Sequence, residues 1–142
     1  MNETIELTLD ESPPRADVDR LRDGLTEHSA SFVDQPGFQP LAVFARDPAG
    51  ELVGGAFGHV NWTWLDVSLL WVAEALRGQG LGSRLLLRFE AAARDKGCRQ
   101  AHVETFSYQA RKFYQRHGYA FFASLADYPP GSSKDFLRKE LD

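Results

Sequence analysis

The clearest chemical signal in this 142-residue chain is the stretch Arg77-Gly78-Gln79-Gly80-Leu81-Gly82-Ser83. It lies between an apolar, strand-like run at residues 65–72 and an amphipathic, helical run at residues 83–96. Three glycines at alternate positions remove side chains where a strand passes into a helix, which opens the backbone N–H groups at the positive end of the helix. An arginine stands beside them. The stretch therefore predicts a cradle for a diphosphate, and with it a phosphorylated cofactor.

Two nucleotide-binding loops fit this stretch poorly. A P-loop needs Lys followed by Ser or Thr after its last glycine, whereas Gly82 is followed by Ser83 and Arg84. A dinucleotide fingerprint starting at Gly78 needs glycine where Ser83 stands, although Glu104 supplies an acidic residue at a suitable distance. That fingerprint also follows the first strand of its domain, and several strands are expected before this loop. The two fingerprints are therefore disfavoured.

The elements around the loop indicate a mixed α/β fold with the loop in the middle of the sheet. Residues 65–72 are apolar on both faces, as expected for a central strand. Helices are expected at residues 17–28, 83–96 and 108–117, the first capped by Asp17 or a neighbour and the second ended by Gly97. Strands are expected at residues 5–9, 41–46, 52–60, 64–72, 100–106, 119–125 and 136–141.

Composition narrows the class of protein. The chain is 43% hydrophobic and 25% charged, which is typical of one globular domain, expected here over residues 1–142. Its net charge of −4 disfavours nucleic-acid binding, and no apolar run is long enough for a membrane span. The first residues lack the pattern of a signal peptide, and the single cysteine, Cys98, fits a reducing cytoplasm. The four histidines lack metal-ligand spacing, so no metal site is expected.

Two motifs resemble the GNAT superfamily of N-acetyltransferases. Arg77, Gly80 and Gly82 match its acyl-CoA signature, Arg/Gln-x-x-Gly-x-Gly/Ala. Residues 110–119, Ala-Arg-Lys-Phe-Tyr-Gln-Arg-His-Gly-Tyr, resemble the family's Ala-x-x-x-Tyr-x-x-x-Gly-Phe segment. The order of elements is also similar from end to end. The resemblance implies a twisted, mostly antiparallel sheet of six to seven strands, flanked by helices and splayed at its central strands.

The resemblance also implies a site for acetyl-CoA as acyl donor. The strand before the loop would pair with the pantetheine arm, and the loop N–H groups would hold the diphosphate. Ser107 stands where the family commonly has an asparagine that contacts the cofactor, which leaves that contact in doubt. The expected cofactor-binding residues are Leu70, Trp71, Val72, Arg77, Gly78, Gln79, Gly80, Leu81, Gly82, Ser83, Ser107, Ala110 and Tyr114.

Three residues are candidates for catalysis. Tyr114 matches the family's tyrosine that protonates the leaving thiolate, although it also fits a helix residue that packs on Phe113. A primary amine is protonated at neutral pH and must lose a proton before it attacks. Asp66 and Glu104 lie on strands expected to border the cleft, and Asp66 is expected to share a strand face with Leu70 and Val72. Either carboxylate is a candidate base, a binding group for a cationic substrate while water carries the proton, or a solvated strand-end residue.

The sequence leaves the acceptor open. The resemblance implies direct attack by a primary amine in a ternary complex, with a small-molecule amine favoured over a protein amine. A non-catalytic acyl-CoA sensor is the alternative, because it would keep the glycine loop without needing Tyr114 or the carboxylates. A homodimer through the last strands is compatible with the sequence but not required by it. Candidate aromatic residues of the acceptor wall are Phe32, Phe38, Trp62, Trp64, Tyr108 and Tyr128.

Overall fold

The computed structural model describes residues 4–34 and 38–142, and the chain divides into two compact units, Met1–Gln35 and Pro36–Asp142. The prediction of one domain therefore stays a prediction. The first unit contains helix α1 (Arg15–Ser29), whose N-cap position is taken by Pro14 without a side-chain hydrogen bond. Asp17, which was expected with its neighbours as a candidate cap, is therefore not the N-cap residue. It lies in the first turn, where a carboxylate interacts favourably with the helix dipole.

The strand expected at residues 5–9 is wrong. These residues form no strand in the described part of the first unit, and the side chains of Ile5, Leu7 and Leu9 are 78%, 92% and 91% exposed. Alternation of apolar and polar residues predicts only that one face of an extended segment could pack on a core. A strand also needs a hydrogen-bonded neighbour, and the described residues of this unit supply none.

The described part of the second unit is built on one six-stranded sheet with the order β1-β2-β3-β4-β6-β5. The central pair, β3 and β4, is parallel, and the other neighbours are antiparallel, which confirms the predicted mixed sheet. The strands are β1 (Gln39–Arg46), β2 (Leu52–Asn61), β3 (Trp64–Val72), β4 (Gln100–Phe106), β5 (Ala120–Ala126) and β6 (Ser133–Glu140). The helices are a short 3-10 turn, η1 (Glu74–Leu76), then α2 (Leu81–Asp95) and α3 (Arg111–Arg116).

The central strands β3 and β4 separate after a short pairing. They pair only from Trp64 opposite Gln100 to Val67 opposite Val103. Beyond that point β3 remains paired with β2 as far as Val72, and β4 remains paired with β6 along its whole length. The predicted splay is therefore confirmed, and beyond it each strand keeps its antiparallel partner on the outer side.

A β-bulge in β3 lies at the point of separation. Phe57 of β2 pairs with Leu69 and the next residue, Gly58, pairs with Val67, so Ser68 is the extra residue. Gly58 is required there because a Cβ at this position would collide with the carbonyl oxygen of Asp66. An inserted residue reverses the alternation of side chains beyond it. Leu65 and Val67 are buried before the bulge, and Leu70 packs on the same core after it.

The bulge overturns one expectation. Asp66 does not share a face with Leu70 and Val72, because the extra residue moves these two side chains to the face on which Leu65 and Val67 are buried. Simple alternation along an unbroken strand was the basis of that prediction. The sequence alone does not reveal that Ser68 forms a bulge next to the pair of Gly58 with Val67.

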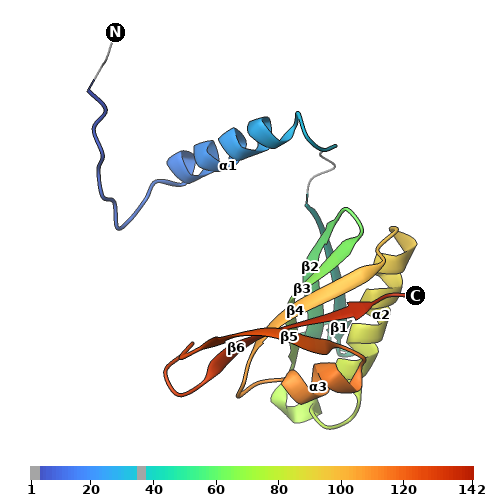
Figure 1. The fold of residues 1–142 in the computed structure, drawn as a ribbon. Coiled ribbons are helices and arrows are strands. Elements are labelled where there is room, and N and C mark those ends of the chain that lie inside the picture. Colours follow the sequence, from blue (N-terminus) through green and yellow to red (C-terminus); the bar gives the residue numbers. More distant parts are fainter. Residues whose placement is uncertain (1–3, 35–37) are drawn as a thin grey trace. The chain divides into compact units, whose positions relative to one another are not determined.

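Helix α2 covers one face of β1, β2 and β3, and β5 and β6 form a long hairpin (Figure 1). The buried residues of α2 include Leu85, Leu86, Phe89 and Ala93, which form the apolar face of this amphipathic helix. Glu90 is also fully buried. Its carboxylate accepts hydrogen bonds from the Tyr119 hydroxyl at 2.7 Å and from Lys139 Nζ at 2.8 Å, so the buried charge is paired. The pair ties α2 to the last strand.

Helix α3 is held at its start by a buried carboxylate on β6. Asp135 is fully buried and accepts hydrogen bonds from the hydroxyls of Ser133 at 2.8 Å and Ser124 at 2.9 Å, and from Arg111 at 3.3 Å. Burial alone would raise the pKa of Asp135, but the bonds from Ser133, Ser124 and Arg111 outweigh it and lower the pKa below its usual value. The interaction fixes the first residue of α3 against the β5–β6 hairpin.

Replacing Asp135 by Asn should lower the free energy of unfolding by about 2 kcal/mol at pH 7, because the charge-assisted bonds are lost. A carboxylate with a depressed folded-state pKa stabilises the fold above its unfolded pKa and loses that contribution as the pH falls through the folded pKa. The deficit of D135N should therefore shrink below the usual value of 3.8. Urea unfolding from pH 7 to pH 3 measures it.

The exposed Glu140→Gln serves as the control, with an expected change below about 0.5 kcal/mol at pH 7. An equal deficit of D135N at pH 7 and pH 3 would contradict the charge-based account. So would wild-type stability of the variant at pH 7.

Candidate active site

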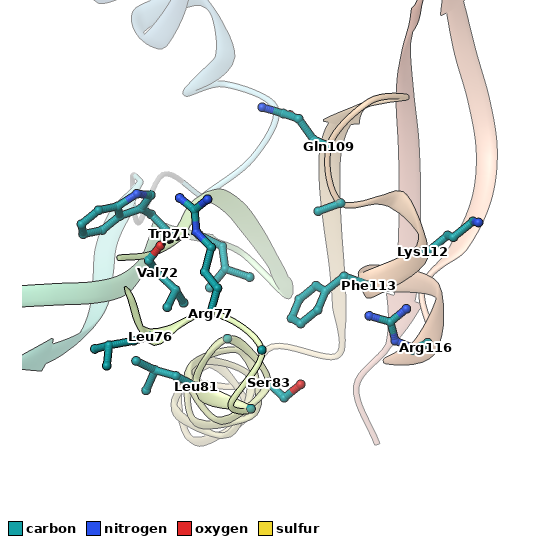
Figure 2. A pocket seen from close by; sticks show the side chains of 15 residues that line it. Trp71, Val72, Leu76, Arg77, Leu81, Ser83, Gln109, Lys112, Phe113 and Arg116 are labelled. Atoms are coloured by element: carbon teal, nitrogen blue, oxygen red, sulfur yellow. Dashed lines mark hydrogen bonds between the residues drawn. The ribbon is translucent and has the colours of Figure 1, made fainter. Parts of the chain in front are cut away.

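A cleft of about 620 Å³ lies beside the separated end of β3 (Figure 2). One wall is the end of β3, with Trp71 and Val72, and the opposite wall carries Lys112, Phe113 and Arg116 of α3. The glycine loop and the first turn of α2 close the cleft between these walls. The cleft is therefore formed by the elements that the two sequence motifs occupy.

The start of α2 offers unpaired backbone donors to this cleft. Gly80 is the N-cap residue with a φ of 84°, a left-handed conformation that glycine adopts without strain, and no side chain caps the helix. The first bond of the helix runs from the N–H of Arg84 to the carbonyl of Gly80 at 3.1 Å. The N–H groups of residues 81–83 precede that bond and have no partner within the helix. An anion in the cleft would satisfy these donors.

The cleft is positively charged in a chain whose net charge is −4. Arg77, Lys112 and Arg116 line it, and the lining residues of the described chain include no Asp or Glu. None of the three cations forms an ion pair with a described residue. Arg77 donates a hydrogen bond from Nε to the carbonyl of Val72 at 3.0 Å, which ties the loop to the end of β3 (Figure 2).

Ser83 connects the two helices that border the cleft. Its hydroxyl is 2.8 Å from Nε2 of His117, the residue that follows α3. The ring of His117 also lies 4.9 Å from that of Phe113, centroid to centroid. These contacts fix the first turn of α2 against α3, so the helix N-terminus and the α3 wall keep a defined separation.

Tyr114 is packed in the core and does not line the cleft. Tyr114 is 5% exposed, and the centroid of its ring lies 5.3 Å from that of Phe113 and 5.5 Å from that of Tyr119. The latter contact belongs to the end of α3, where the N–H groups of Gly118 and Tyr119 bond to the carbonyls of Gln115 and Tyr114 in a Schellman motif. The Tyr-x-x-x-Gly-Tyr part of the second sequence motif thus has a structural function of its own.

The hydroxyl of Tyr114 nevertheless carries a proton that it could donate. It makes no hydrogen bond to a described residue, and no enclosed side-chain oxygen or nitrogen of the described residues lacks a partner. The hydroxyl oxygen is therefore not fully enclosed by the described residues. Burial of the ring raises the pKa of Tyr114 to about 12, so the phenol is protonated at neutral pH.

Asp66 and Glu104 meet in a second cavity of about 410 Å³ between the separated strands. Lys134 lies in the same lining and is 3.0 Å from Glu104, an ion pair that raises the pKa of the Lys134 ammonium. Asp66 accepts a hydrogen bond from the Ser68 hydroxyl at 2.9 Å and lies 3.8 Å from Nε2 of His102. Glu104 is thus engaged by a strong cation, whereas Asp66 is not held by a lysine or arginine of the described residues.

Gln109 lines both the cleft and the acidic cavity. Its side-chain oxygen accepts the N–H of Phe106 at 3.3 Å and the hydroxyl of Thr105 at 3.5 Å, so the amide nitrogen has no partner among the described residues. Gln109 therefore borders both spaces, of which one is lined by three cations and the other by two carboxylates and Lys134.

Most of the predicted cofactor residues come together in the cleft. The ones that line it are Leu70, Trp71, Val72, Arg77, Gly78, Gly80, Leu81, Gly82, Ser83 and Ala110. Gln79, Ser107 and Tyr114 do not line it. The Ser107 hydroxyl instead accepts the N–H of Ser133 at 3.0 Å, which attaches the loop after β4 to the start of β6.

The sequence reasoning missed the outer wall of the cleft. Gln109, Lys112, Phe113 and Arg116 line it, and Leu76 contributes from η1. The first four stand at positions i, i+3, i+4 and i+7, which is the spacing of one helix face. That spacing was visible in the sequence and could have identified them.

The described residues offer neither a metal site nor a membrane-spanning helix. Among the described residues, no group of three or more His, Cys, Asp or Glu side chains could hold a metal ion. No helix within that part of the chain is long and apolar enough to cross a membrane. Cys98 is buried, and burial raises the pKa of its thiol, as expected for a small core residue.

Comparisons with known proteins agree with this geometry. The sequence profile of the Acetyltransferase (GNAT) family matches residues 2–119. The chain is 54% identical to a blasticidin-S acetyltransferase of Streptomyces morookaense over 107 residues, covering 72% of this chain and 79% of that protein. It is 34% identical to an acetyltransferase of Agrobacterium fabrum over 121 residues, covering 85% and 88%.

A solved structure shows the same architecture. The crystal structure of an acetyltransferase from Bacillus cereus superposes with a TM-score of 0.84 at 29% identity, covering 94% of this chain and 98% of that one. The family profile spans both the glycine loop and the segment that contains α3. The chain therefore belongs to the GNAT family of acetyltransferases.

Proposed function

We propose that this acetyltransferase transfers an acetyl group from acetyl-CoA to a primary amine of a small molecule, by direct attack in a ternary complex. The observation that carries the proposal is the separation of charge around Gln109. A basic cleft with an uncapped helix N-terminus meets a cavity with two carboxylates at this residue. An anionic donor and a cationic acceptor would each find the matching charge, and their reacting groups would meet at the junction.

The donor side fits the chemistry of coenzyme A. Several backbone N–H groups at the start of α2, and three cations that form no ion pair with a described residue, suit a diphosphate and further phosphate groups. The inner edge of β3 beyond Val67 has no strand partner, so an extended pantetheine arm would pair with it as an added strand. Family membership and the cleft together support acyl-CoA, and acetyl-CoA is the donor that we propose.

On the acceptor side, Asp66 is the stronger candidate for the base. Glu104 is neutralised by Lys134 at 3.0 Å, whereas Asp66 has only a serine hydroxyl and a histidine nearby. The attacking amine would lose its proton to Asp66 directly or through water, and the nitrogen lone pair would then attack the thioester carbonyl. Tyr114, protonated at neutral pH, would give its proton to the departing thiolate.

The acceptor is proposed from the relatives and from the acidic cavity. A relative that is 54% identical is a blasticidin-S acetyltransferase, which makes blasticidin S the first amine to test. A non-catalytic acyl-CoA sensor would keep the basic cleft but has no use for the acidic cavity. We place the activity in the cytoplasm, in accord with a buried and unpaired Cys98.

Purified protein should release free thiol from acetyl-CoA only when an accepted amine is present. Blasticidin S, a polyamine, an aminoglycoside and an amino-acid amide form a suitable panel, followed with a thiol reagent and mass spectrometry of the product. Acetyl-CoA and CoA, but not NAD, should raise the thermal unfolding midpoint. Stabilisation by NAD alone would contradict the donor assignment, and acetyl-CoA binding without turnover of any amine would favour the sensor.

Asp66→Asn tests the proposed base in the same assay. It should retain the affinity for acetyl-CoA and lower the rate with the best amine by about 100-fold at pH 7, since removal of a general base has effects of this order. Full activity of D66N would exclude Asp66 as the base and leave Glu104 or a water relay.

Tyr114→Phe should lower kcat by about 100-fold while the affinity for acetyl-CoA stays within twofold, because only the proton donor is removed. The matched control is Tyr119→Phe. This tyrosine lies in the same cluster, but its hydroxyl is bonded to Glu90 at 2.7 Å and should affect stability rather than kcat. Steady-state kinetics and urea unfolding of both variants separate the two effects. Equal kcat of wild type and Y114F would refute the acid role.

A further inference from the structure

The rim of the acidic cavity carries a row of aromatic rings that the proposed chemistry does not use. Phe106, the last residue of β4, lines the cavity. The ring of Tyr108 stacks on it at 5.5 Å with an interplanar angle of 5°, and the ring of Tyr128 stacks on it at 6.0 Å and 26°. The three rings come from β4, from the turn that follows it and from the β5–β6 connection.

The outer two rings are open to solvent. Tyr108 is 62% exposed and Tyr128 is 47% exposed, and neither belongs to the core cluster. Isolated exposed aromatic residues need no explanation, but a stacked row beside a cavity is an apolar patch with a defined orientation. Tyrosine also provides a large, rigid contact surface with little loss of side-chain entropy.

Charged groups connect the row to the two carboxylates. Lys134 is 3.0 Å from Glu104, and its Nζ lies 4.9 Å from the centre of the Tyr128 ring. Asp66 lies in the same cavity lining as Glu104 and Phe106. A single small molecule could therefore place an ammonium group at the carboxylates and a flat ring at the aromatic row.

We propose that Tyr108, Phe106 and Tyr128 form a binding subsite for a planar aromatic or heteroaromatic ring of the acceptor. The inference rests on the proposed function, because it assigns the acidic cavity to the acceptor amine. It names the acceptor class as a small cationic amine joined by a short linker to a flat ring. Stacking favours flat π-systems over saturated rings of similar size, since the latter offer no planar face.

The test compares 2-phenylethylamine with 2-cyclohexylethylamine, which differ in aromaticity but have the same linker and amine. Affinity is measured by calorimetry in the presence of CoA, and turnover is measured with acetyl-CoA. We expect at least about fivefold preference for the phenyl compound, in the range of stacking contributions. A purely apolar surface would prefer the more hydrophobic cyclohexyl compound, and equal or reversed affinity would overturn the subsite.

Tyr108→Leu and Tyr128→Leu should each reduce the preference at least threefold through KM, while the affinity for CoA stays unchanged because neither residue lines the cleft. The control is Phe122→Leu, an aromatic residue on β5 that is 55% exposed and does not line the acidic cavity. If the Phe122 variant changes the preference equally, or if the tyrosine variants change phenyl and cyclohexyl binding alike, the row has no recognition role.

Failure of the subsite and failure of the proposed function give different results. Turnover of both amines with no preference would keep the acetyltransferase activity and refute the ring subsite. A phenyl preference in binding would support the subsite even where turnover is slow. Binding of neither amine, together with turnover of an aliphatic amine from the first panel, would place the acceptor elsewhere and refute it.

Discussion

The parallel pairing of β3 with β4 is limited to four residue pairs, from Trp64–Gln100 to Val67–Val103, and both candidate sites depend on this limit. Each strand keeps an antiparallel partner on its outer side, whereas the inner edges beyond Val67 and Val103 have no strand partner among the described residues. The backbone N–H and C=O groups along such an edge have no hydrogen-bond partner in the sheet. The edge can therefore receive an extended ligand without any rearrangement of the sheet. The bulge at Ser68 is possible because Gly58 carries no side chain at that point. Beyond the bulge, Leu70 and Val72 lie on the core face of β3, whereas Asp66 lies on the opposite face.

The separation of β3 from β4 also places groups of opposite charge in two different spaces. The cleft on the α3 side collects unpaired cations and the uncapped start of α2, whereas the cavity between the strands collects Asp66 and Glu104. Under the proposed function, an anionic donor and a cationic acceptor would bind on either side of Gln109 without competing for the same groups. The buried anchors support this arrangement. Asp135 fixes the start of α3, and Glu90 ties α2 to β6, so both helices that border the cleft are held by paired buried carboxylates.

Local signals in the sequence were sufficient for the sheet, for α2 with its buried face and for the glycine loop. They were insufficient where a distant contact decides the outcome. Residues 5–9 alternate like a strand, but no described strand of their unit pairs with them. The bulge at Ser68 depends on Gly58, which is remote in the sequence, so the face of Asp66 was assigned incorrectly. The contact of Ser107 with the cofactor, doubtful from the sequence, stays a prediction, and its hydroxyl accepts the N–H of Ser133. Lys112 and Arg116 follow a helical spacing and could have been found.

A crystal structure with acetyl-CoA bound tests the central claim most directly. The account predicts diphosphate oxygens within about 3 Å of the N–H groups of residues 81–83, with the pantetheine arm along the inner edge of β3. A larger groove of about 730 Å³, lined by Arg46, Arg84 and Arg88, lies between β1 and α2 and offers a rival site for an anion. Diphosphate density in that groove, with the cleft beside α3 empty, would contradict the account.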